Sequence, residues 1–249
     1  FMFEILIKFD RKNYLVDIIY EKILEKKKSI KIGDINLIFF IPNRITLERV
    51  NTFFTKEPEI IKWIESFKIN STFFDIGSNI GLYSCLAAKT KRSKVFSFEP
   101  SPLNLEVLTK NIFINNLNDQ ITIVKNPLHS ENKISSMNFS NQQIGGALST
   151  FSENFGFDGK KMNTVFSYNT NSFTLDNFVN FYKLVNPNYI KIDVDGIEHL
   201  ILKSSLNTLK NVESVFVEIN ENFEDQNKKV KEILERSGLK LIERHKRSE

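Results

Sequence analysis

Cysteine and histidine are scarce in this chain, and their scarcity limits the classes of protein to which it can belong. The 249 residues include one cysteine and three histidines. Cys85 alone cannot form an internal disulfide, so a disulfide-stabilised secreted domain is excluded. The three histidines, at positions 129, 199 and 245, stand apart in the sequence, and each is by default a surface or helix-flanking residue rather than a catalytic base.

Long apolar runs are also missing. No segment approaches the ~20 apolar residues that a membrane-spanning helix needs. The first residues, "FMFEILIKFDRKNY", lack a basic region followed by a small-residue cleavage site, so no secretory signal is predicted. With the single cysteine, these absences favour a cytoplasmic protein without a membrane span.

A large excess of charge is absent as well. The chain has 34 basic and 30 acidic residues, for a formal net charge of +4. Its basic runs are short and scattered: 26–28, 160–161, 228–229 and 244–247. None alternates with aromatic residues as a nucleic-acid groove does, so we expect solvated surface and no nucleic-acid partner.

The composition is that of one large globular domain, or one domain with an elaborated edge. Hydrophobic residues make up 41% of the chain and charged residues 26%. The 23 phenylalanines are expected to fill much of the core.

The first 70 residues predict a helix and a hairpin rather than an independent domain. An apolar stripe predicts a helix over 13–27, and Gly33-Asp34 between two strand-like runs predicts a hairpin. A further helix should begin near Thr55, with Pro58 in its first turn. We expect this extension, 1–70, to form a lid or platform on the substrate side.

From residue 71 strands alternate with helices. This rhythm predicts an α/β, Rossmann-like, doubly wound and mostly parallel sheet over 71–249. A stretch rich in Ser, Asn and Gly, 129–173, interrupts it; a stretch of this length is usually functional or disordered. The six predicted strands are 71–77, 94–100, 121–126, 188–196, 212–220 and 239–246.

The segment "STFFDIGSNIG", 71–81, carries the first functional signal. In doubly wound sheets, ligands bind at the carboxyl ends of strands where the strand order reverses. Gly77 and Gly81 allow a sharp turn close to a ligand, before a helix whose first N–H groups lack partners. Glu99 ends the second strand, where an acid accepts both hydroxyls of a ribose.

The same turn argues against a pyrophosphate ligand. Dinucleotide sites use Gly-x-Gly-x-x-Gly, whereas Asn79 stands at the second glycine position here. Asp75, just before the turn, would repel phosphates and suits a cationic nucleoside such as S-adenosyl-L-methionine. An NAD-dependent oxidoreductase is therefore disfavoured. A non-catalytic nucleotide-binding protein and a nucleic-acid methyltransferase stay open as alternatives.

At this point the chain resembles the FkbM-type class I methyltransferases. Matching segments occur in family order over about 49–220, among them "FFDIGSNIGLYS", "VFSFEPSPLNLEVLTKNIFINN" and "YIKIDVDGIEHLILK". Two residues depart from the family pattern: Asp195 replaces a usual Glu, and Ser78 a usual Ala. The usual seventh strand is also missing after Arg247, so we expect a truncated chain.

The resemblance implies O-methyl transfer to a hydroxyl of a sugar, a glycolipid or polysaccharide precursor, or a secondary metabolite. It implies S-adenosyl-L-methionine as cofactor and a small-molecule or glycan acceptor. The residues expected at the cofactor are Asp75, Gly77, Ser78, Asn79, Gly81, Glu99, Pro100, Ser101, Asn104 and, less directly, Asn126.

Asp193, at the end of the fourth strand, is the predicted catalytic base or acceptor-orienting group, with Glu198 and His129 in reserve. Acids at a helix start also have a structural role, through the helix dipole. We expect no metal, although Mg²⁺ on Asp193, Asp195 and His199 stays an alternative. The insertion with "NQQIGGALST" is expected in the acceptor pocket, either closing over a polar substrate or acting as a flexible linker.

Overall fold

Five parallel strands form the central sheet of the computed structural model, which describes residues 14–245. Their spatial order is β10-β9-β3-β4-β5, so the chain starts in the middle, runs to one edge and returns on the other side of β3. The strand order therefore reverses between β3 and β9, and the predicted Rossmann-like fold is confirmed. The strands are β3 (Thr72–Ile76), β4 (Lys94–Phe98), β5 (Ile121–Val124), β9 (Tyr189–Ile192) and β10 (Ser214–Val217).

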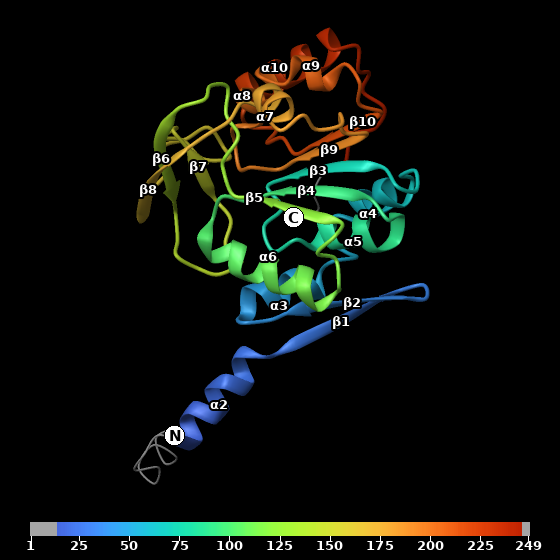
Figure 1. Cartoon of the computed structure of the whole chain (residues 1–249). Helices are drawn as coiled ribbons and strands as arrows, with labels where there is room; N and C mark the ends of the chain where they lie inside the picture. Colours follow the sequence, from blue (N-terminus) through green and yellow to red (C-terminus); the bar gives the residue numbers. More distant parts are fainter. Residues whose placement is uncertain (1–13, 246–249) are drawn as a thin grey trace.

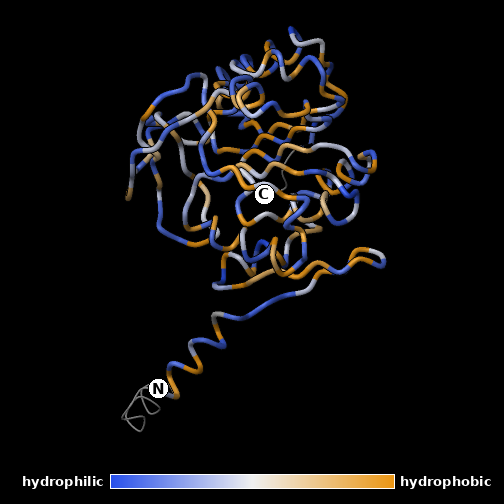
Figure 2. Tube along the Cα trace, viewed as in Figure 1, coloured by the Kyte–Doolittle hydropathy of each residue, from blue (hydrophilic) through white to orange (hydrophobic). Residues whose placement is uncertain are grey.

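Alternation along the strands produces two apolar cores, one on each face of the sheet. In β3, Phe73 faces one core and Phe74 and Ile76 face the other, because successive side chains point to opposite faces. Helices α4 (Pro58–Glu65), α5 (Leu82–Lys91) and α6 (Pro102–Ile114) cover the first face. Helices α7 (Leu175–Phe181), α8 (Glu198–Lys203), α9 (Leu206–Leu209) and α10 (Glu224–Arg236) cover the second (Figure 1). Figure 2 shows hydrophobic segments along the central strands.

Four N-terminal elements precede α4: α2 (Tyr14–Leu24), β1 (Lys27–Ile32), β2 (Ile35–Phe40) and α3 (Arg44–Asn51). The last three contribute buried residues to the first core. The predicted hairpin at Gly33-Asp34 is confirmed, and so is the helix with Pro58 in its first turn. Strand β2 is fastened to α6, where Asn111 Oδ1 accepts from the Phe40 N–H at 2.7 Å. Helix α2 points away from the rest of the molecule (Figure 1).

The insertion, 129–173, folds into a small sheet instead of an irregular loop. It contains β6 (Ile134–Phe139), β7 (Ser149–Phe151) and β8 (Phe166–Asn171), in the antiparallel order β7-β6-β8. Its buried Met137, Phe139 and Phe151 extend the second core. The high Ser and Asn content hid these strands, since only alternate residues face the core.

The predicted sixth strand is wrong in the part that the structure describes. Residues 239–245 run as irregular chain, and Ile242 is 90% exposed, so no sheet face buries its alternating apolar residues. The opening segment (1–13), with the missing-signal prediction, and the last residues (246–249) lie outside the described part. Between residues 14 and 245, no helix is long and apolar enough to cross a membrane.

Candidate functional site

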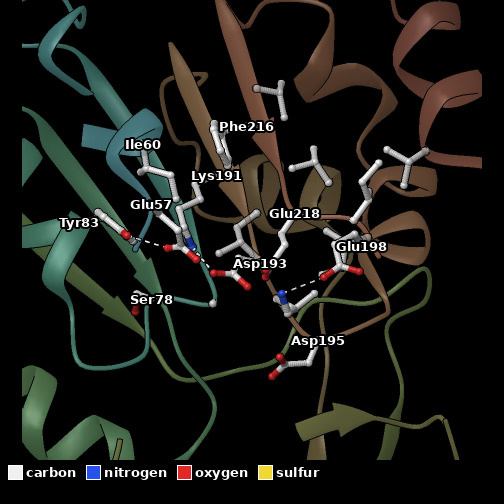
Figure 3. Close-up of a pocket in the computed structure, with 18 of the residues that line it drawn as sticks. Glu57, Ile60, Ser78, Tyr83, Lys191, Asp193, Asp195, Glu198, Phe216 and Glu218 are labelled. Atoms are coloured by element: carbon white, nitrogen blue, oxygen red, sulfur yellow. Dashed lines mark hydrogen bonds and ion pairs between the residues drawn. The ribbon is translucent and has the colours of Figure 1, made fainter. Parts of the chain in front are cut away.

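An open cleft of about 2140 Å³ runs along the carboxyl ends of the central strands and continues along the edge strand β10 to α10 and residues 238–245. All five strands deliver side chains or turns to it, β5 through Asn126, and Figure 3 shows residues that follow β3, β9 and β10. Gly77 and Ser78 follow β3, Glu99 follows β4, Asp193 follows β9, and Glu218 follows β10. The cleft lies at the strand-order reversal, where doubly wound sheets bind ligands.

The turn after β3 is built around glycines that no other residue can replace without strain. Gly77 has φ +83°, and a Cβ on it would lie 1.8 Å from the carbonyl oxygen of Asp193. Gly81 has φ +80°, and a Cβ there would lie 2.4 Å from Leu108 Cδ1. Gly77 thus lets the turn after β3 touch the turn after β9, while Gly81 lets α5 start against α6.

Glu99 occupies the predicted position at the end of β4. Its Oε2 accepts from the Asn79 N–H and its Oε1 from the Ser101 N–H, both at 2.8 Å. Burial raises the pKa of Glu99 to about 7, against the effect of these hydrogen bonds. Because a carboxylate oxygen accepts more than one hydrogen bond, both oxygens keep acceptor capacity towards the cleft.

Three other predicted cofactor residues have defined places. Ser78 lines the cleft, and its buried Oγ finds no hydrogen-bond partner among residues 14–245. The Pro100 carbonyl accepts from Tyr168 Oη at 2.6 Å. Asn126 also lines the cleft, with its amide bonded to Asn171. An unpartnered buried hydroxyl beside a glycine turn fits a polar ligand group.

Two predicted cofactor residues do not reach the cleft wall. Asp75 is fully buried, accepts from Ser84 Oγ at 2.6 Å and lies behind Lys191. Ser101 precedes α6 as predicted, but its hydroxyl makes no capping hydrogen bond; its backbone N–H holds Glu99 instead.

Residues 144–148, here called the glycine loop, close one side of the cleft. Asn104 holds the loop twice, accepting from the Gly145 N–H at 2.9 Å and donating to the Gly146 carbonyl at 3.2 Å. Asn79 Nδ2 donates to the same carbonyl at 2.8 Å. Asp195 Oδ2 accepts from the Leu148 N–H at 2.7 Å. Side chains expected at the cofactor therefore also fasten this loop, which is more than a flexible linker.

Replacing Asn104 by alanine is expected to loosen the glycine loop, because two hydrogen bonds to its backbone disappear. Losing them should weaken closure by about 1–3 kcal/mol. Amide hydrogen exchange over 144–148 should accelerate, whereas alanine at the exposed Asn118 should leave it unchanged. Equal exchange in both variants would show that Asn104 does not hold the loop.

Of the predicted catalytic residues, Asp193 and Glu198 line the cleft, and Asp193 is the more exposed of the two. Its side chain is 27% exposed, and its Oδ2 accepts from Lys191 Nζ at 3.0 Å (Figure 3). The carboxylate stands next to the touching point of the two turns, since its own carbonyl oxygen faces Gly77.

The two reserve candidates lie in different surroundings. Glu198 is buried, accepts from the Val194 and Gly196 N–H groups, and is bonded by Gln226, so it braces the turn after β9. Burial raises the pKa of Glu198 to about 7. His129 is absent from the described lining of the cleft; its buried ring contacts Glu153 at 3.3 Å, and burial lowers its pKa.

Sequence reasoning missed three residues of the cleft. Lys191, Glu57 and Tyr83 all line it, and Tyr83 Oη donates to Glu57 Oε2 at 2.7 Å. Lys191 had a readable signal, because a lysine inside the buried run "YIKID" needs a partner charge. Glu57 and Tyr83 come from elements far apart in sequence and carried no such signal.

Metal-ligand geometry is not found in the part of the chain between residues 14 and 245, where no group of three His, Cys, Asp or Glu side chains converges. The two acids of the Asp193-Val-Asp195 pair are engaged separately. Asp193 binds Lys191, while Asp195 binds the glycine loop.

Taken together, the sheet order, the glycine turn after β3 and the acid after β4 define a Rossmann-like fold with a ligand site at the strand-order reversal. The methyltransferase FkbM domain family matches residues 75–241, which is more than half of the chain. The chain belongs to the FkbM methyltransferase family.

One curated relative and two solved structures indicate the range of similar proteins. Hexuronic acid methyltransferase AglP of Haloferax volcanii is 28% identical over 165 residues, 66% of this chain and 62% of that protein. This chain thus spans less than two thirds of the relative's length. The methyltransferase FkbM structure from Methylobacillus flagellatus KT is 16% identical, with a TM-score of 0.49 over 76% of this chain and 47% of that one. Precorrin-6y C5,15-methyltransferase from Geobacter metallireducens GS-15 is 13% identical, with a TM-score of 0.43 over 73% and 70%.

Proposed function

We propose that this protein transfers a methyl group from S-adenosyl-L-methionine to a hydroxyl group of a sugar or sugar-containing acceptor. The observation that carries the proposal is the position of Asp193. Its carboxylate lies in the same cleft as Glu99. It follows the β9 strand at the point where the turn after β3 comes so close that a Cβ on Gly77 would clash with the Asp193 backbone.

The charges of the cleft fit a cationic nucleoside better than a dinucleotide. No lysine or arginine occurs in the turn, 77–81, where a pyrophosphate would need one or a free backbone approach. In this proposal Glu99 accepts the ribose hydroxyls and Ser78 makes a further polar contact; the buried, unpartnered Ser78 hydroxyl supports this. When bound, the cofactor supplies an electrophilic methyl group on a positively charged sulfur.

The residues of this chain then have three tasks. Asp193 accepts the proton of the acceptor hydroxyl or orients that hydroxyl, and general base assistance of this kind contributes about 10²–10⁴-fold. The turn at Gly77 and the acid Glu99 position the cofactor, since alignment supplies a large part of such rate enhancements. The glycine loop excludes water from that side of the cleft.

A sugar acceptor is favoured by the relative and by the polar side chains among the residues that line the cleft. The relative's name assigns it to hexuronic acids. In this chain Arg49, Glu57 and Tyr83 line the cleft from elements outside the central sheet. Such hydrogen-bonding groups suit sugar hydroxyls, and Arg49 also suits a carboxylate. We expect the N-terminal extension to form part of the acceptor side, as the sequence predicted.

The proposal is tested by offering the purified protein and S-adenosyl-L-methionine to a panel of neutral sugars, uronic acids and glycolipid precursors. A mass gain of one methyl group on a hydroxyl-bearing product is the expected result. An RNA arm tests the nucleic-acid alternative. Binding of NAD without binding of S-adenosylhomocysteine in calorimetry would refute the proposal and favour an oxidoreductase.

Cofactor affinity should fall in mild acid. The pKa of Glu99 lies near 7, and only its ionised form accepts both ribose hydroxyls, so protonation below that pH removes an acceptor. The dissociation constant of S-adenosylhomocysteine should be about tenfold higher at about pH 6 than at about pH 8. The Glu99→Gln variant should bind weakly with a flat pH profile; the same slope in both proteins would assign it to another group.

A further inference from the structure

A row of polar side chains crosses the central sheet beneath α5. Asp75 of β3 stands in register with Ser97 of β4 and Lys191 of β9, so the three side chains share one face. Two residues earlier along each strand, the same face carries Phe73, Val95 and Tyr189 of the first apolar core. Charged groups in such a place need an explanation, because burying them without a partner is costly.

The contacts within this row lead to the cleft. Ser97 Oγ donates to Ser84 Oγ, and Ser84 Oγ donates to Asp75 Oδ2, both at 2.6 Å. Lys191 Nζ lies 3.7 Å from Asp75 Oδ1 and 3.0 Å from Asp193 Oδ2. The Lys191 and Asp75 side chains are 1% and 0% exposed, whereas Asp193 is 27% exposed. Asp193 is therefore the one of these three charged side chains that is substantially exposed to solvent in the cleft.

The surroundings keep Lys191 charged. Burial by itself lowers the pKa of Lys191, but the carboxylates of Asp193 and Asp75 outweigh this effect and raise it above the usual value. The other groups that face Lys191 are the Tyr83 ring, whose centre lies 5.5 Å from Nζ, and the Glu57 carboxylate, which also raises the pKa of Lys191. Lys191 is therefore a fixed positive charge and not a base.

We propose that Lys191 is a positioning residue of the methyl-transfer site: anchored on Asp75, its ammonium fixes the rotation of the Asp193 carboxylate. Asp75 then acts through Lys191 and not by touching the cofactor. This inference rests on the proposed function of Asp193. It requires no contact between Lys191 and the acceptor, because the ammonium works by binding Oδ2.

The first test compares turnover of wild type and Lys191→Met on an acceptor that the wild type methylates. The variant should lose about 10²-fold in kcat, since a small misplacement of a reacting group has effects of that size. The acidic limb of its kcat–pH profile should move to higher pH, because a neighbouring ammonium favours the ionised carboxylate. Affinity for S-adenosylhomocysteine should stay unchanged, and Lys191→Arg should recover part of the rate.

The second test needs neither cofactor nor acceptor. Lys191→Met leaves the Asp75 carboxylate buried without its cation and should lower the Tm of the ligand-free protein. The variants Asp75→Asn and Asp75→Asn/Lys191→Met complete a double-mutant cycle. The double variant removes both charges and should melt at a higher temperature than Lys191→Met alone. Lys94→Met, at an exposed lysine of β4, is the matched control and should change neither Tm nor kcat.

The outcomes separate this inference from the proposed function. If the wild type neither binds S-adenosylhomocysteine nor methylates any acceptor, the proposed function fails, while the melting cycle still reports on the Asp75–Lys191 pair. If the wild type is active and Lys191→Met keeps its kcat and pH profile, Lys191 is not a positioning residue. A parallel loss of cofactor affinity and kcat, or strictly additive Tm changes in the cycle, also overturns the proposal.

Discussion

Asparagine at position 193 is expected to reduce kcat by about 10²–10⁴-fold while S-adenosylhomocysteine binds as in the wild type. The amide keeps the size of the side chain but cannot take a proton from a hydroxyl. Cofactor contacts predicted at Glu99 and Ser78 are untouched, so affinity should persist. Single-turnover methyl transfer and calorimetry on the same preparation measure the two quantities separately.

The matched control for this experiment is Asp119→Asn. Asp119 is an exposed acid between α6 and β5, and its replacement makes the same chemical change outside the cleft. It should leave kcat at the wild-type value. Unchanged turnover in Asp193→Asn would remove Asp193 from the mechanism. A loss of cofactor affinity as large as the loss of kcat would instead make it a binding residue.

Alanine at Gly77 is expected to have the largest effect on the folded protein. A methyl group there would lie 1.8 Å from the Asp193 carbonyl oxygen, a backbone atom that cannot rotate away. The φ of +83° adds about 1–2 kcal/mol for an L-residue. Overpacking adds about 1–3 kcal/mol or more. We expect the free energy of unfolding to fall by about 3 kcal/mol or more, with weaker binding of S-adenosylhomocysteine.

Gly238 offers a control with nearly the same backbone. Its φ is +84°, and a Cβ on it would meet nothing within 4 Å. Gly238→Ala should therefore show only the left-handed backbone cost of about 1–2 kcal/mol. Urea unfolding of both variants isolates the contact with Asp193. Equal losses would mean that the two turns can separate, and that the close approach is not required.

Much of the fold was readable because its signals are local. The runs around Phe73, Val95 and Ile190 are short, apolar and bounded by turn residues, and each became a strand of the parallel sheet. The prediction of a strand at 239–246 was wrong, because an alternating apolar pattern shows only that a segment could pair in a sheet, not that a neighbouring strand is there to pair with it. No neighbour buries Leu241 or Ile242 in the described chain. Helix α3 was missed because it is short and mostly polar, with Ile45, Leu47 and Val50 as its apolar residues.

The candidate site was readable to a smaller extent. Gly77, Glu99 and Asp193 follow strands at fixed places, so sequence position alone predicts that they meet at one edge of the sheet. Asp75 was expected at the cofactor on the same grounds, yet it faces Lys191 from inside the protein. The direction of a side chain depends on what packs above it, and here that is the Ser84 hydroxyl of α5.

The amino-acid sequence was sufficient to establish the order of the elements and the chemical groups available at the carboxyl edge of the sheet. This was possible because strand periodicity, glycine turns and acids at strand ends are properties of neighbouring residues. Tertiary structure alone decided which acid reaches the cleft, which one is buried, and that the glycine loop is fastened by Asn79 and Asn104. These outcomes depend on contacts between distant segments, where burial and close approach, rather than local preference, determine the free energy.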